Sequence, residues 1–185
     1  MGSVFVAGSM NIKGLAPEIQ ARIDNMLSSH LAIVVGDADG ADAAVQRYLA
    51  KVSARQVTVY CSGASPRNNI GNWPVKPVTS PHEPGSRAFH TAKDIEMAAI
   101  ADYGLMIWDA RSTGTLSNII ELIGRGKASL VFLNKRKEFW KIANIADLEK
   151  LVNKFMSEGA RRLAETKIRL GVRIESLKHE QAKMF

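Results

Sequence analysis

The sequence has 185 residues, of which 46% are hydrophobic and 23% charged, and its formal net charge is +7. These values describe an ordinary globular protein with a sizeable core, and they exclude a collagen-like or disulfide-rich chain. No stretch approaches the ~18–20 apolar residues of a membrane-spanning helix, so we expect no membrane partner. The first residues lack the basic region of a signal peptide, which favours a cytoplasmic location. The single cysteine, Cys61, and four scattered histidines offer no disulfide and no metal-ligand spacing, so neither a metal ion nor a cofactor is expected.

The positive charge is concentrated in the last third of the sequence. Residues 1–123 hold 10 basic and 11 acidic side chains, whereas residues 124–185 hold 15 basic and 7 acidic ones. A basic segment of this kind binds nucleic acid in some proteins and forms a solvated helical surface in others. We favour the solvated surface, because aromatic side chains for base stacking are sparse there, and nucleic acid is the less favoured partner.

Short apolar runs alternate with segments of helical periodicity along the first 136 residues. The runs predict five strands, at 3–7, 31–35, 56–60, 103–108 and 129–133. The periodic segments predict a helix that begins near Pro17 and further helices at 41–51, 91–100 and 115–123. Alternating strands and helices form a parallel sheet that is covered on both sides. The sequence therefore predicts a Rossmann-like α/β domain over residues 1–136, with an open parallel five-stranded sheet and helices on both faces.

Two segments fall outside this alternation. Residues 61–90 contain five of the six prolines, and so long an irregular stretch is either a binding loop or lid, or disordered. From residue 137 onward the pattern becomes purely helical, which predicts a basic helical C-terminal extension over 137–185. Within it an apolar residue recurs every seven positions, at Leu163, Leu170, Leu177 and Met184. This stripe either joins two subunits in a coiled coil or lies against its own domain, and we expect a homo-oligomer.

The loop that follows the predicted strand 103–108 has the composition of an anion site. Ser112, Thr113 and Thr115 supply hydroxyl groups, and Gly114 allows the backbone to approach a ligand closely. The loop leads directly into a helix, whose N-terminal N–H groups and dipole favour negative charge. Capping of the helix by Ser or Thr is compatible with this role. The sequence therefore predicts a phosphate site at the carboxyl edge of the sheet, where open α/β folds bind ligands.

Two earlier loops should meet the same edge. Gly8 and Ser9 follow the first strand, and the second strand is followed by a loop of small and acidic residues: Gly36, Asp37, Asp39, Gly40 and Asp42. Its carboxylates suit ribose hydroxyls, a divalent cation or an amine, although one of them also suits the cap of the next helix.

Three further segments add candidate side chains. Arg67 and Asn68, together with Arg87, lie in or beside the long loop and could close over an anion. Lys93 and Asp94 fall within the first turns of the helix predicted over 91–100.

With these loops assembled, residues 3–133 resemble the SLOG superfamily of Rossmann-like nucleotide-binding domains. That group includes the lonely-guy phosphoribohydrolases and the nucleotide-binding domain of the DNA-processing protein of natural transformation. The resemblance rests on the segments 4–9, 36–42, 66–68 and 101–115 and is greatest to an uncharacterised branch. It places the phosphoribohydrolase Gly-Thr pair on Gly114 and Thr115, the catalytic glutamate on Asn118 and the catalytic arginine on Lys93.

Both catalytic positions depart from the family pattern. An amide such as that of Asn118 cannot serve as a general acid or base, and a lysine lacks the planar fork of arginine. Asp94 or Asp109 would have to supply the carboxylate, with Lys93 as a third tentative catalytic residue. We therefore expect a protein that binds a nucleotide or a nucleotide-derived phosphate ligand. The alternative is a hydrolase or transferase acting on the N-glycosidic bond of a nucleotide, and the sequence leaves open whether the protein is an enzyme.

Overall fold

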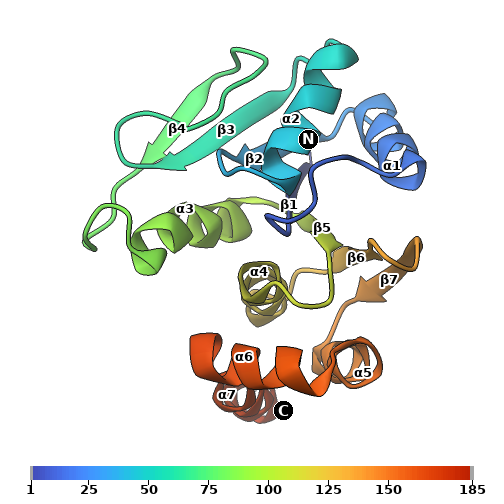
Figure 1. Cartoon of the computed structure of the whole chain (residues 1–185), viewed down its shortest axis with the longest axis vertical. Coiled ribbons are helices and arrows are strands. Elements are labelled where there is room, and N and C mark those ends of the chain that lie inside the picture. Colours follow the sequence, from blue (N-terminus) through green and yellow to red (C-terminus); the bar gives the residue numbers. More distant parts are fainter. Residues whose placement is uncertain (1, 184–185) are drawn as a thin grey trace.

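The computed structural model describes residues 2–183 and contains one mixed sheet with helices on both of its faces (Figure 1). The seven strands of the described chain lie in the order β4-β3-β2-β1-β5-β6-β7. All neighbouring strands are parallel except the antiparallel pair β6 and β7. The strands are β1 (Ser3–Gly8), β2 (Ala32–Gly36), β3 (Val57–Ser62), β4 (Val75–Val78), β5 (Tyr103–Trp108), β6 (Ser129–Leu133) and β7 (Glu138–Ile142).

The prediction of an α/β fold is confirmed, but the prediction of five parallel strands is wrong. Two further strands, β4 and β7, lie at the edges of the sheet and lack the continuous apolar run by which the other strands were predicted. β4 lies inside the segment expected to be irregular. It is short and mostly exposed, and Pro77 interrupts its apolar character, as is typical of an edge strand. β7 follows β6 through a tight turn in which Lys137 has a φ of 55°. The expectation of a purely helical chain from residue 137 is therefore also wrong.

The two faces of the sheet bury separate apolar clusters. Alternate residues of the strands point to opposite faces, so Val4 and Val6 pack under α1 and α2, while Phe5 and Ala7 pack under α3 and α4. The helices that form these layers are α1 (Pro17–Ser28), α2 (Ala41–Lys51), α3 (Arg87–Ile100) and α4 (Thr113–Gly124). Within residues 2–183, no helix combines the length and apolar character needed to cross a bilayer.

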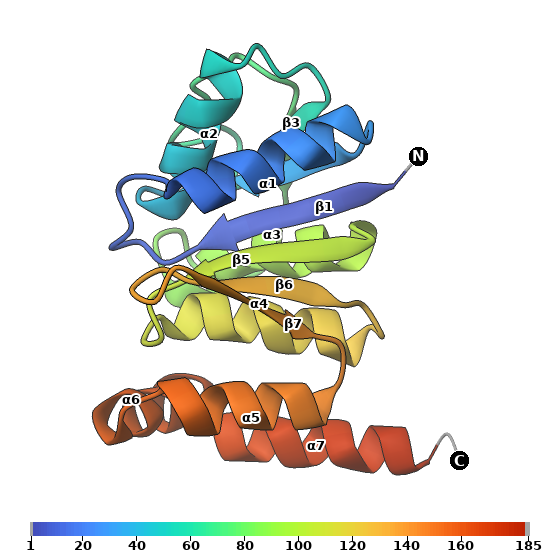
Figure 2. The same cartoon turned by 90° about the vertical axis from the view of Figure 1, so that its right-hand side faces the viewer.

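Three C-terminal helices extend the layer that contains α3 and α4 (Figure 2). They are α5 (Ile145–Phe155), α6 (Glu158–Ile168) and α7 (Leu170–Ala182). Arg169, with a φ of 52°, separates α6 from α7, so the heptad stripe is not one continuous helix. Leu170 is buried and Leu177 is partly buried against the same core, which shows that these residues lie against their own chain. Met184 lies outside the described residues, and the homo-oligomer stays a prediction.

Leu170 tests how firmly the C-terminal helices are anchored. Its side chain is 6% exposed, whereas Val172 on the same helix is 53% exposed. We expect Leu170→Ala to lower the free energy of unfolding by about 2–4 kcal/mol, because it leaves a cavity in the core. Val172→Ala should change it by less than about 0.5 kcal/mol. Urea denaturation measures both values, and equal losses in the two variants would show that α7 is not packed on the core.

Candidate functional site

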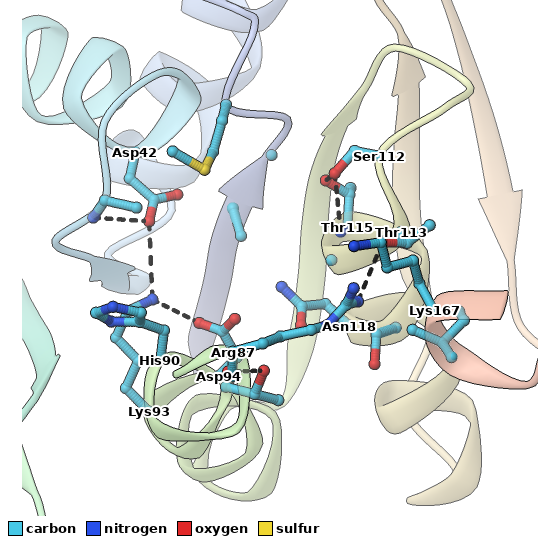
Figure 3. A pocket seen from close by; sticks show the side chains of 18 of the residues that line it. Asp42, Arg87, His90, Lys93, Asp94, Ser112, Thr113, Thr115, Asn118 and Lys167 are labelled. Atoms are coloured by element: carbon cyan, nitrogen blue, oxygen red, sulfur yellow. Dashed lines mark hydrogen bonds and ion pairs between the residues drawn. The ribbon is translucent and has the colours of Figure 1, made fainter. Parts of the chain in front are cut away.

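A cleft of about 880 Å³ opens at the carboxyl edge of the sheet, where the strand order reverses between β1 and β5 (Figure 3). Loops after β1, β2 and β5 reach it, together with α3, α4 and the end of α6. The predicted site residues that line the cleft are Gly8, Asp42, Arg67, Lys93, Asp94, Asp109, Ser112, Thr113, Gly114, Thr115 and Asn118. Those that do not line it are Ser9, Gly36, Asp37, Asp39, Gly40 and Asn68.

The loop between β5 and α4 is held by its own polar groups. Asp109 Oδ1 accepts hydrogen bonds from the backbone N–H of Arg111 at 2.9 Å and of Ser112 at 2.7 Å. Ser112 caps α4, since its Oγ accepts from Thr115 N at 3.3 Å. The two preceding N–H groups, of Thr113 and Gly114, find no acceptor among residues 2–183. Capping by Ser112 therefore leaves these two N–H groups without a partner in the described chain, and Asp109 acts on the loop itself.

Ser9, which follows β1, holds the loop between β5 and α4 in place. Its side chain is fully buried, and its Oγ accepts from Asp109 N at 3.1 Å and lies 3.4 Å from Thr115 Oγ1. Gly8 allows the close approach of β1 to its neighbours, because a Cβ there would collide with the carbonyl oxygen of Ile107. Ser9 therefore positions the loop between β5 and α4 without lining the cleft.

The loop after β2 is tied to the segment around Arg67. The Asp37 carboxylate receives Arg67 Nη2 at 2.8 Å, Nε at 3.2 Å and the backbone N–H at 3.0 Å. Burial raises the pKa of Asp37, but the hydrogen bonds from Arg67 and the charge of Lys93 outweigh it and hold the pKa below its usual value. Asn68 Nδ2 donates to the carbonyl oxygen of Asp37 at 2.8 Å and to Asp39 Oδ1 at 3.1 Å. Asp37, Asp39 and Asn68 thus bind one another and fix this side of the cleft.

Lys93 is the centre of a buried group of charges. Its Nζ lies 2.6 Å from Asp94 Oδ1 and 4.0 Å from both Asp42 Oδ2 and Asp37 Oδ1. Burial lowers the pKa of Lys93, but the surrounding carboxylates, led by Asp94, raise it above its usual value. Burial raises the pKa of Asp42 to about 7, partly offset by Lys93. Gly36 leaves the room for this group, since a Cβ there would lie 2.7 Å from Lys93 Nζ.

The opposite side of the cleft is rich in cations. Arg87 Nη2 donates to Thr113 Oγ1 at 3.0 Å, and Arg111 and Lys167 also line the space. None of these three forms an ion pair within residues 2–183. Arg173 donates to Ser117 Oγ at 2.6 Å and to Glu121 Oε1 at 2.7 Å. This side therefore carries positive charge that the described chain does not neutralise.

Sequence reasoning missed several residues of the cleft. Lys167 and Arg173 come from α6 and α7, whose sequence pattern indicates only a solvated surface or a subunit contact. The excess of basic residues after position 124 was the available signal, but nothing in the pattern indicated which of them would turn inward. Met10 and His90 also line the cleft and were not predicted.

Asn118 occupies the inner part of the cleft, on α4. It is 6% exposed, and its side-chain amide has no hydrogen-bond partner among residues 2–183. Its amide atoms are not among the fully enclosed polar atoms that lack a partner, so they are open to the cleft that the residue lines. The amide can both donate and accept, so it suits a polar ligand atom.

Within residues 2–183, no three His, Cys, Asp or Glu side chains converge as a metal site would require. Asp94 is a carboxylate that lines the cleft with a side-chain exposure of 22%.

No protein-family model matches the chain, and no curated protein sequence matches it. Among solved structures, the chain is similar to DNA processing protein A from Helicobacter pylori, which was studied for its unique mode of binding single-stranded DNA. The TM-score is 0.56 at 16% sequence identity, and the match covers 91% of this chain and 80% of that one. At this identity the likeness shows a shared fold, and the SLOG branch stays a prediction.

The titration of Asp42 can be tested through stability. Its pKa of about 7 in the folded protein exceeds the usual 3.8, so the folded state holds a proton that the unfolded chain has lost. The contribution of this raised pKa to the free energy of unfolding is fully present below pH ~4 and is lost as the pH rises through about 7. An Asn cannot ionise, so the stability of Asp42→Asn should not show this loss. As the pH rises over this window, the free energy of unfolding of the variant minus that of the wild type should therefore increase by up to about 1.4 kcal/mol per pH unit.

Urea denaturation between pH ~4.5 and ~8 measures this difference. Asp39→Asn removes an exposed carboxylate from the same loop and is the matched control. A constant difference between Asp42→Asn and the wild type across this range would show that Asp42 is already ionised in the fold.

Proposed function

We propose that the cleft binds a nucleotide or a nucleotide-derived ligand with a phosphate group at the N-terminus of α4. The observation that carries this proposal is the pair of free N–H groups, of Thr113 and Gly114, which face a cleft bordered by unpaired cations. Backbone N–H groups and the helix dipole stabilise a phosphate, and arginine adds bidentate hydrogen bonds. The cleft volume of about 880 Å³ is within the range of small-molecule sites.

The rest of the cleft suits the remainder of a nucleotide. Met10 and Ile95 line it and are 56% and 42% exposed, which provides apolar surface for a base. Asp94 and Asn118 supply polar groups for sugar hydroxyls. The loop after β2 contributes Ala38 to the lining and the start of α2 contributes Asp42, and we propose that the sugar lies near α3 and α4 rather than along that whole loop.

Gly114→Ala separates phosphate binding from folding. A Cβ at this position would meet only Ser112 Oγ, at 4.0 Å, and alanine is the better helix former by up to about 1 kcal/mol. The variant should therefore be at least as stable as the wild type. Its methyl group projects beside the N–H groups that receive the phosphate, so the affinity for AMP should fall at least about tenfold, or 1.4 kcal/mol. Isothermal titration calorimetry gives both dissociation constants.

Gly159→Ala is the matched control. Gly159 is also the second residue of a helix capped by a serine, and nothing lies within 4 Å of a Cβ built there. This variant should bind AMP as the wild type does. The proposal fails if neither nucleotides nor inorganic phosphate bind the wild type, or if both glycine variants bind them equally well.

Cleavage of an N-glycosidic bond is a second candidate function, favoured by the position of Asp94. Asp109 is occupied by its own loop and Asn118 is an amide, so Asp94 is the carboxylate in the cleft that could stabilise an oxocarbenium-like carbon. Its partner Lys93 lies 2.6 Å away and fixes its position. Mass spectrometry of nucleoside monophosphates incubated with the protein should then detect free base, and Asp94→Asn should reduce the rate at least about 100-fold. Intact nucleotides after incubation with the wild type would exclude this activity.

Single-stranded DNA is a competing ligand, supported by the reported DNA binding of the similar structure and by the excess charge after residue 124. Phosphate contacts of a basic surface weaken steeply with salt, whereas a nucleotide enclosed in a cleft is less sensitive. The AMP titration is therefore repeated with a short single-stranded oligonucleotide in about 200 mM salt. Tighter binding of the oligonucleotide under these conditions would favour the strand as the ligand.

A further inference from the structure

Beside the phosphate loop, the cleft has a second group of polar side chains, which we call the α6 corner. It consists of Arg87, Ser117, Asn118, Lys167 and Arg173, all of which line the cleft. Figure 3 shows that Arg87 crosses the opening toward Thr113 and that Lys167 points into the same region from α6. The α6 corner therefore adjoins the proposed phosphate site at the N-terminus of α4.

The cations of the α6 corner exceed the anions that the protein places beside them. Glu121 pairs with Arg173 at 2.7 Å, while Arg87 donates only to an uncharged hydroxyl and Lys167 has no ion pair within residues 2–183. Burial lowers the pKa of Arg173, and the charge of Arg87 lowers it further against the opposing effect of Glu121. The guanidinium groups of Arg87 and Arg173 thus repel each other, and an anion bound between them would neutralise their charge.

Asn118 provides an independent sign of a ligand in this corner. It is nine-tenths buried, lines the cleft and leaves its amide without a partner among residues 2–183. The contrast with Ser117 is informative, because the neighbouring hydroxyl is satisfied by Arg173 at 2.6 Å. The amide N–H₂ of Asn118 is a donor suited to a phosphate oxygen.

We propose that the α6 corner is a second phosphate subsite and that the ligand class is a nucleoside diphosphate or a derivative containing a diphosphate. This inference rests on the proposed nucleotide-binding function and adds the number of phosphate groups. One phosphate lies on the N–H groups of Thr113 and Gly114, and its neighbour lies between Arg87, Lys167 and Asn118.

The arrangement favours two linked phosphates over one phosphate or a nucleic-acid strand. Arg87 already lies within 3.0 Å of Thr113, so the two subsites share a side chain and adjoin directly. A diphosphate places its groups side by side, whereas successive phosphates of a strand are separated by a sugar. A monophosphate, with a charge of about −1.5 to −2, would leave part of the positive charge of Arg87, Arg111 and Lys167 without a counter-ion.

The experiment compares AMP and ADP by titration calorimetry without divalent metal ions, using the wild type, Lys167→Ala and Lys150→Ala. Lys150 is exposed on α5 and does not line the cleft, so its removal changes the net charge equally. In the wild type and in Lys150→Ala, ADP should bind at least about tenfold more tightly than AMP. In Lys167→Ala the ratio of the two affinities should fall below about threefold.

Equal affinities of AMP and ADP in the wild type would overturn the second subsite and leave the proposed function intact. The second subsite is also overturned if Lys167→Ala weakens the binding of AMP and of ADP by the same factor. It is likewise overturned if Lys150→Ala lowers the ratio of the ADP and AMP affinities as much as Lys167→Ala does. Tighter binding of a single-stranded oligonucleotide than of ADP would overturn it as well. Absence of binding by either nucleotide would overturn both the subsite and the nucleotide-binding function.

Discussion

The structure of the cleft depends on the burial of one ammonium group. Lys93 is 3% exposed, and moving an unpaired charge of this kind out of water would cost several kcal/mol. Asp37, Asp42 and Asp94 surround it, and Arg67 balances Asp37 from the other side. Because these residues come from the loop after β2, the start of α2, the segment before β4 and helix α3, the need to neutralise one lysine fixes four parts of the chain to each other. When Asp42 carries a proton, the positive charges of Lys93 and Arg67 are balanced by the negative charges of the other two carboxylates, Asp37 and Asp94.

The cleft therefore has two unlike sides. On the side of Lys93 and the loop after β2 the polar groups satisfy one another, which leaves little free charge. On the side of α4 and α6 the helix N-terminus, Arg87 and Lys167 are left without anionic partners in the described chain. A ligand with a charged end and an apolar or polar end would be oriented by this asymmetry, since only one side attracts its anionic group strongly.

The sequence predicted the parts of the fold that depend on local pattern. The strand 103–108 and the turn Ser112–Thr115 into the next helix were located correctly, because buried strands are continuously apolar and helix caps have a restricted composition. β4 was missed because an exposed edge strand with a proline lacks that pattern, and β7 because its mixed residues resemble a helix start. The position of Asp37 in a closed network and of Lys167 inside the cleft depends on contacts between residues far apart in the chain. No spacing rule reports such contacts, so the sequence assigned Asp37 to the ligand and Lys167 to the solvent.

The break at Arg169 has a consequence for how the site is assembled during synthesis. The left-handed turn there sends α7 across α6 (Figures 1 and 2), and together the two helices bring Lys167 and Arg173 to a cleft whose lining residues outside these helices all precede the end of α4. The sheet and the loop between β5 and α4 therefore precede, in the order of synthesis, the two helices that supply these cations. The cations Lys167 and Arg173 join the cleft later in synthesis, because the helices that carry them follow all of its other walls in the sequence.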